Sequence, residues 1–154
     1  MPNHSSGNRC TLDPLLLEND TMKIKTSELT GTALDWAVAK CEGKNGVLHD
    51  DGITRCIVIA AASGVYKGTW KPSVNWSQCG PIIEREEIDL YCDVPTNPAY
   101  KDPSWRGSWR ARYSRCGYGT DMYHGPTALI AAMRCYVASK LGAEVEIPNE
   151  LIGE

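Results

Sequence analysis

Apolar residues near the end of the chain recur at the spacing of a helix over residues 126–141. They lie three or four positions apart and predict one apolar stripe along an amphipathic helix: Leu129, Ile130, Met133, Tyr136, Val137 and Leu141. Pro126 is a typical first residue and Gly142 a typical end of such a helix. Arg134 and Lys140 fall off the stripe or at its edge. We expect this helix to pack with its stripe against a sheet.

Two further helices are predicted earlier in the chain, over about 27–42 and 74–86. The first follows the cap-like Thr26-Ser27 pair and carries its own apolar stripe, which comprises Leu29, Ala33, Trp36, Ala37 and Cys41. The second has Ser73 or Asn75 as its cap and contains Pro81, which kinks a helix at the preceding turn.

Strand-like patterns occupy much of the remaining sequence. Continuous apolar runs or alternating positions predict strands over residues 55–62, 65–70, 88–92, 108–115 and 145–147. The segment 44–52, with the sequence KNGVLHDDG, has the composition of a turn. Residues 93–107 contain three prolines and are predicted to form a loop.

These elements predict an α+β fold. We expect a mainly antiparallel sheet of four or five strands packed with about three helices, in the order αββαββαβ. Residues 22–154 form a single domain, as the length of 154 residues indicates. Residues 1–21 are polar and carry no period, so we interpret them as a disordered arm or as sequence upstream of a true start at Met22.

Composition narrows the class of protein. With 42% hydrophobic and 23% charged residues the chain is typical of a globular domain, and its net charge of −3 gives no electrostatic case for nucleic acid or an anionic membrane. No apolar run approaches the length of a membrane span. The seven cysteines include no CxxC pair, so a disulfide framework or a zinc ribbon is not expected.

Three blocks of sequence together carry a family resemblance. They are MKIKTSELTGTALDWAVAKCEG, WKPSVNWSQCGPIIEREEI and GPTALIAAMRCYVASKLGAEVEIP, with the Trp-containing segment SWRARY before the last of them. Over about 22–152 the chain resembles the phage NinX family, small tailed-phage and prophage proteins of unassigned function. The resemblance implies a phage origin, the host cytoplasm and a small α+β domain. It supplies no catalytic residues, and residues 1–21 and 93–107 depart from the family pattern.

The segment from Trp105 to Arg115 holds four of the chain's arginines and two of its tryptophans. On a strand, Trp109 would face one side and Arg110 and Arg112 the other, with the two guanidinium groups about 7 Å apart. Such a pair suits a phosphate or carboxylate ligand. The alternative is a solvated strand face whose arginines pair with acidic residues in 84–87, and we weigh it slightly higher.

Asn75 and Trp76 stand at a predicted helix start and form a second candidate. A tryptophan beside an amide could stack on a base or bind an amide, and helix N-termini attract anions. The alternative is that Trp76 is a core or hairpin aromatic, since large aromatic residues are mostly packing residues.

Other candidate chemistry is weaker. Residues 116–121, CGYGTD, lack the spacing of a P-loop, and His49-Asp50-Asp51 has no second ligand pair nearby in sequence. Neither Cys79 nor Cys116 has local support as a nucleophile with His124 as its base. The sequence therefore predicts no catalytic residues, no metal site and no cofactor.

Two functions remain open. The first is a non-enzymatic phage accessory protein that binds or sequesters a small anionic or nucleotide-like host molecule, as in counter-defence, through Asn75, Trp76, Trp109, Arg110 and Arg112. The second is a protein-binding module that blocks or redirects a host or phage protein through an Arg/Trp/Tyr surface. An uncharacterised enzyme comes third. Sheet edges and the surplus of tryptophan also make a homo-oligomer an expectation.

Overall fold

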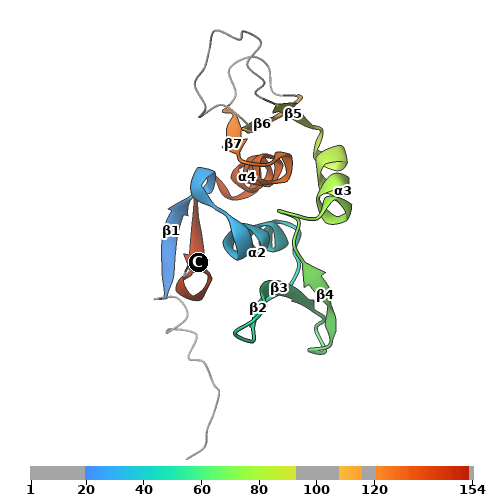
Figure 1. The fold of residues 1–154 in the computed structure, drawn as a ribbon, viewed down its shortest axis with the longest axis vertical. Helices are drawn as coiled ribbons and strands as arrows, with labels where there is room; N and C mark the ends of the chain where they lie inside the picture. The colour runs from blue at the N-terminus through green and yellow to red at the C-terminus, as the bar shows by residue number, and fades with distance from the viewer. Residues whose placement is uncertain (1–19, 93–107, 116–120, 153–154) are drawn as a thin grey trace, which may run out of the picture.

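The computed structural model describes residues 20–92, 108–115 and 121–152 (Figure 1). Most of the predicted arm 1–21, the predicted loop 93–107 and the Gly-rich segment 116–120 lie outside these residues. Within them the chain forms β1 (Thr21–Lys25), α2 (Gly31–Cys41), β2 (Gly46–Asp50), β3 (Arg55–Ala60), β4 (Tyr66–Trp70), α3 (Trp76–Glu86), β5 (Ile88–Cys92), β6 (Trp109–Tyr113), β7 (Tyr123–Gly125), α4 (Ala128–Leu141) and β8 (Glu144–Pro148), with the 3-10 helices η1 (Thr26–Glu28) and η3 (Asn149–Leu151).

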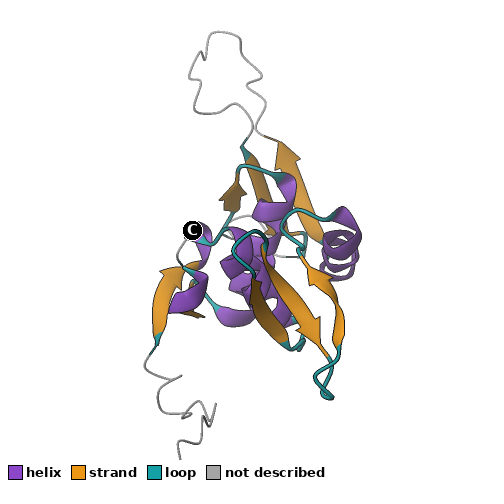
Figure 2. Ribbon diagram, turned by 60° about the horizontal axis from the view of Figure 1, so that its bottom comes forward, coloured by secondary structure: helices purple, strands orange, loops and turns teal. Residues whose placement is uncertain are grey.

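The helix α4 lies at the centre of the fold. It contacts α2, α3, η1 and strands from two different sheets (Figures 1 and 2). Burial therefore extends around most of the helix, and Arg134, expected off the apolar stripe, is itself buried. The prediction of a one-sided stripe is wrong because small residues between the large ones, such as Ala131 and Ala132, let neighbouring elements approach from other directions.

The start of α4 also differs from the prediction. The helix begins at Ala128, two residues after the predicted first residue Pro126. Thr127 is its N-cap, and the side-chain oxygen of Thr127 accepts a hydrogen bond from the backbone N–H of Ile130 at 3.2 Å. At the other end Gly142 has a φ of 93°, which glycine adopts without a steric cost. The predicted helix is otherwise confirmed to Leu141.

The strands β5, β6 and β7 form an antiparallel sheet over one side of α4. Ala111 is fully buried, and Trp109 and Tyr113 pack against the core, so the predicted face of β6 is confirmed. The three-residue strand β7 was not predicted. Its last residue, Gly125, approaches α4 so closely that an added Cβ would lie 2.6 Å from the backbone nitrogen of Ala131.

A second antiparallel sheet has the order β2-β3-β4 and packs on α2. The predicted turn at 44–52 is wrong over Gly46–Asp50, which is the strand β2. The turn-like glycines remain at its two ends, while Val47 and Leu48 align opposite the apolar residues Val58 and Ile57 of β3. Pairing with this buried neighbour outweighs the weak local strand signal.

The third sheet joins the two ends of the described chain. In it β1 pairs antiparallel with β8, with Met22 opposite Ile147 and Ile24 opposite Val145. The predicted helix 27–42 begins only at Gly31, because Thr26 is bound to this end of the fold. Its backbone N–H donates to the carbonyl of Ala143 at 2.8 Å, and its hydroxyl donates to the carbonyl of Gly142 at 2.7 Å.

The helix α3 connects the second sheet to the first. Asn75 is its N-cap, Pro81 lies inside it, and Glu87, with a φ of 53°, turns the chain into β5. The α+β class and the predicted order of most elements are confirmed. The eight strands of the described residues are divided among three small antiparallel sheets, where the sequence predicted one sheet of four or five strands. None of the described helices is long and apolar enough to cross a membrane.

Candidate functional site

The outward side of the sheet β5–β6–β7 carries the two predicted arginines. We call it the arginine face and define it by Asp89, Tyr91, Arg110, Arg112 and His124. Direct cross-strand pairing places Arg112 opposite Asp89, and Arg110 opposite both Tyr91 and His124. Because Ala111 points to α4, the residues on either side of it share the opposite face.

Arg112 is held by an aromatic ring and a carboxylate. Its guanidinium lies 5.1 Å from the centroid of the Tyr91 ring, and its Nε lies 3.6 Å from Oδ2 of Asp89. Hydrogen bonding from the hydroxyl of Ser114 is the main cause that lowers the pKa of Asp89, with Tyr91 and Arg112 adding to it. Asp89 is therefore charged at neutral pH, and Arg112 is oriented beside it.

Arg110 contacts a thioether sulfur. Its Nη1 lies 3.7 Å from the sulfur of Met122, just before β7. The alternative weighed from the sequence, pairing of arginines with residues 84–87, holds for Arg115, whose guanidinium pairs with Glu87. It does not describe Arg112, which pairs with Asp89.

The remaining predicted residues lie elsewhere. Trp109 packs against the core on the side of β6 away from Arg110 and Arg112. Asn75 and Trp76 stand at the start of α3, whereas β5 follows its end, so a helix about 16 Å long separates them from the arginine face. Trp76 is 58% exposed, which contradicts the alternative of a core residue. Asn75 accepts a hydrogen bond from the backbone N–H of Ser77 at 2.9 Å and so caps the helix.

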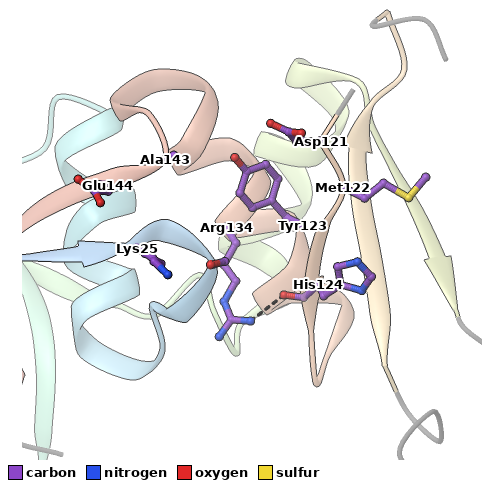
Figure 3. A pocket seen from close by; sticks show the side chains of 9 residues that line it. Lys25, Asp121, Met122, Tyr123, His124, Arg134, Ala143 and Glu144 are labelled. Carbon is purple, nitrogen blue, oxygen red and sulfur yellow. Dashed lines mark hydrogen bonds between the residues drawn. The ribbon is translucent and has the colours of Figure 1, made fainter. Parts of the chain in front are cut away.

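A pocket of about 420 Å³ opens behind β7, between that strand, the end of β1 and the loop from α4 to β8 (Figure 3). Its lining includes two cations and two carboxylates, which are Lys25, Arg134, Asp121 and Glu144. Tyr123 projects to the same side of β7 as Arg134, while the imidazole of His124 projects to the other side (Figure 3). The pocket and the arginine face are thus on opposite sides of one strand.

Arg134 is the most constrained group of this pocket. It is 9% exposed, donates from Nε to the carbonyl of Leu29 at 2.9 Å, and donates from Nη1 to the carbonyl of His124 at 2.6 Å. Burial lowers the pKa of its guanidinium from the ordinary value. The side chain fastens α4 both to the segment before α2 and to β7.

Sequence reasoning missed Arg134 as a site residue. The signal was present, because Arg134 is a single charge within the otherwise apolar run from Ala128 to Val137. A charged residue in such a run is buried and hydrogen-bonded, as Arg134 is, when other elements enclose the helix on all sides. The periodicity instead suggested a solvated edge.

Other candidate groups give little chemistry. His49 lies 3.6 Å from Asp51, whose other oxygen accepts hydrogen bonds from the N–H groups of Ile53 and Thr54. Among the described residues, no group of three His, Cys, Asp or Glu side chains could hold a metal ion. Burial raises the pKa of the Cys79 thiol to about 12, so this cysteine is poorly suited to act as a nucleophile.

The comparison with known families agrees with the resemblance seen in the sequence blocks. A family described as Bacteriophage P22, NinX matches residues 25–140. This range contains both candidate regions, the arginine face and the residues around Arg134, apart from Ala143 and Glu144. No curated protein matches the chain.

Proposed function

Because the chain belongs to the phage NinX family, we propose that it acts as a non-enzymatic phage accessory protein that binds a small anionic, nucleotide-like host molecule. A place in the host cytoplasm, and a role in counter-defence by sequestration, are parts of this proposal. The family gives the phage origin, and the ligand class rests on the residues described above.

The observation that carries this proposal is the shared orientation of Arg110 and Arg112 on the arginine face. Two guanidinium groups about 7 Å apart along one strand can contact two oxygens of a phosphate or two neighbouring phosphates. Stacking on Tyr91 restrains Arg112, which reduces the entropy lost on binding. The contact of Arg112 with Asp89 is long at 3.6 Å, so a phosphate could replace it with shorter, bidentate hydrogen bonds.

Trp76 contributes differently from what the sequence suggested. Its distance along α3 places it outside any small ligand bound between Arg110 and Arg112. We therefore assign ligand contact to the arginine face, with Arg110 and Arg112 as anion contacts and Tyr91 as the supporting ring.

The second candidate is a protein-binding module, and one observation favours it. Large apolar side chains are exposed along β4 and the segment leading into α3: Val65 by 63%, Tyr66 by 60%, Val74 by 68% and Trp76 by 58%. Exposed aromatic and aliphatic side chains are typical of partner surfaces.

A thermal-shift experiment separates the two candidates. The purified protein is heated with a panel of nucleotides and cyclic nucleotides. A ligand present at 100 times its Kd should add about 2.7 kcal/mol to the free energy of unfolding. Arg110→Ala and Arg112→Ala should abolish the shift without unfolding the domain, and Arg115→Ala serves as the control because Arg115 is exposed and pairs with Glu87 outside the arginine face.

The outcomes are distinct. A shift that survives both substitutions would exclude the arginine face as the site. No shift with any nucleotide, together with a host protein that co-purifies in wild type and is lost on Trp76→Ala, would favour the protein-binding module.

A further inference from the structure

We propose that the pocket around Arg134 is a second site, which binds a small zwitterion: a molecule with one carboxylate and one ammonium group, such as a free amino acid. This inference rests on the pocket residues alone and does not depend on the arginine face.

The first argument is a buried charge that forms no ion pair with a carboxylate of the described residues. Arg85, Arg112 and Arg115 each lie within 4 Å of a carboxylate. Arg134 is more deeply buried than any of them, yet its hydrogen bonds within the described residues go only to two neutral carbonyl groups. A buried cation without a counter-charge is costly, and an anion bound beside it would offset that cost.

The second argument is that Arg134 keeps donors for such an anion. Nε and Nη1 are occupied by the carbonyl groups of Leu29 and His124. Nη2 makes no hydrogen bond to any described group, and Arg134 lines the pocket. A guanidinium has five N–H donors in a fixed plane, so those of Nη2 remain for a ligand oxygen. The carbonyl groups hold that plane in position before any ligand arrives.

Other groups of the pocket add to the anion contact. Lys25 supplies a second cation from the end of β1, and Ser27 and Tyr123 supply hydroxyl groups. Burial raises the pKa of Tyr123, so its hydroxyl keeps its proton and can donate to a carboxylate. The volume of about 420 Å³ lies in the range of small-molecule sites.

The carboxylates of the pocket decide the class of ligand. Asp121 and Glu144 are both exposed, and Glu144 lies directly opposite Lys25 in the β1–β8 pair. Two cations and two carboxylates leave the pocket close to neutral, and a phosphate with two charges would lie near both carboxylates. A zwitterion instead offers its carboxylate to Arg134 and Lys25, and its ammonium group to Asp121 or Glu144.

The test titrates the full chain, by calorimetry and by amide NMR, with free amino acids, sodium acetate, methylammonium chloride and inorganic phosphate. Concentrations should reach about 50 mM, since ligands this small bind in the millimolar range at modest efficiency. We expect at least one amino acid to shift the amide signals of Tyr123 and Glu144, and to do so with a lower Kd than acetate, methylammonium or phosphate.

Variants then locate the binding. Lys25→Met should weaken it about fivefold, the effect of losing one partly exposed ion pair. Lys23→Met is the matched control, because Lys23 lies two residues earlier on β1 and does not line the pocket. Tyr123→Phe gives an independent second variant. Arg134→Met is informative only if circular dichroism and unfolding show that it folds, so the test does not rely on it.

Four results would overturn the proposal. One is the absence of binding by every amino acid to folded wild-type protein, and another is phosphate that shifts the amide signals of Tyr123 and Glu144 with a Kd as low as that of the best amino acid. The third is an equal loss of binding in Lys23→Met and Lys25→Met. Binding that is lost in Arg110→Ala but kept in Lys25→Met would assign the ligand to the arginine face and also overturn the pocket site, while supporting the proposed function.

Discussion

The hydroxyl of Tyr136 donates a 2.6 Å hydrogen bond to Oε1 of Glu42, across 94 residues of sequence. The same carboxylate forms an ion pair with Arg85, so the end of α2, the end of α3 and the middle of α4 meet at one polar group. Tyr136 is 2% exposed and Glu42 has a side chain 14% exposed. This contact fixes how the three helices pack.

Removing the hydroxyl of Tyr136 should destabilise the protein. We expect Tyr136→Phe to lower the free energy of unfolding by about 1.5–3 kcal/mol, the range for a hydrogen bond to a charged group. Urea denaturation measures it. Tyr66→Phe is the control, since the hydroxyl of Tyr66 is on an exposed side chain and lies 3.0 Å from that of Thr69, and it should change stability by less than about 0.5 kcal/mol. Equal effects in the two variants would contradict the role of Tyr136.

The same contact predicts a dependence of stability on pH. Burial alone would raise the pKa of Glu42, but hydrogen bonds from Arg85 and Tyr136 outweigh it and the pKa lies below the ordinary 4.5. The stabilisation is therefore fully present above pH 4.5 and is lost as the pH falls through the lower, folded-state pKa. In Glu42→Gln, the free energy of unfolding should fall less steeply with acid below pH 4.5 than in wild type. Parallel curves for the two proteins would rule out this contribution.

The close approach of Gly125 to α4 predicts that a larger residue at this position destabilises the fold. A Cβ at this position would lie 2.6 Å from the backbone nitrogen of Ala131, which cannot move without displacing α4. Gly125→Ala should therefore cost about 1–3 kcal/mol by overpacking. In Gly46→Ala the nearest atoms, Cβ of Ala39 and Cγ2 of Ile57, lie farther away at 3.0 Å and have to shift less, so the loss should be smaller. Thermal unfolding of both variants gives the comparison, and the reverse order would refute the argument.

Substitutions of Asn75 separate its structural role as the cap of α3 from a role in ligand contact. Asn75→Ala should cost about 1 kcal/mol through loss of the α3 cap, and Asn75→Asp should retain most of the stability because Asp caps equally well. Neither change should alter nucleotide binding at the arginine face, which lies at the other end of α3. A loss of binding in a folded Asn75→Asp protein would restore Asn75 as a ligand contact.

The predicted elements and the missed ones differ in where their signal lies. The strands β3, β5 and β6 and the helices α3 and α4 follow from local runs and periods, because each buries apolar residues at the spacing of its own geometry. Local runs and periods did not predict the strand β2 or the late start of α2. Pairing with β3 decides the first, and the bonds of Thr26 to Gly142 and Ala143 decide the second. The partners of Thr26 are remote in sequence, whereas β3 is the next strand along the chain and its pairing with β2 outweighs the turn-like composition of residues 44–52.

The candidate sites show the same division. Alternation along β6 correctly placed Arg110 and Arg112 on one face, since it depends only on neighbouring residues. The position of Trp76 relative to them depends on the direction of α3, and the burial of Arg134 depends on elements that enclose α4 from several sides. Neither property is encoded within a short window of sequence.

The pairing of β1 with β8 also has a consequence for synthesis. As the chain leaves the ribosome, β1 emerges among the first of the described elements, but its only described partner strand is separated from it by more than a hundred residues. Gly142 and Ala143, whose carbonyl groups accept the hydrogen bonds of Thr26, emerge equally late from the ribosome. Until β8 has emerged, β1 remains an unpaired edge that other chains can contact, so the β1–β8 sheet forms only after β8 has been synthesised.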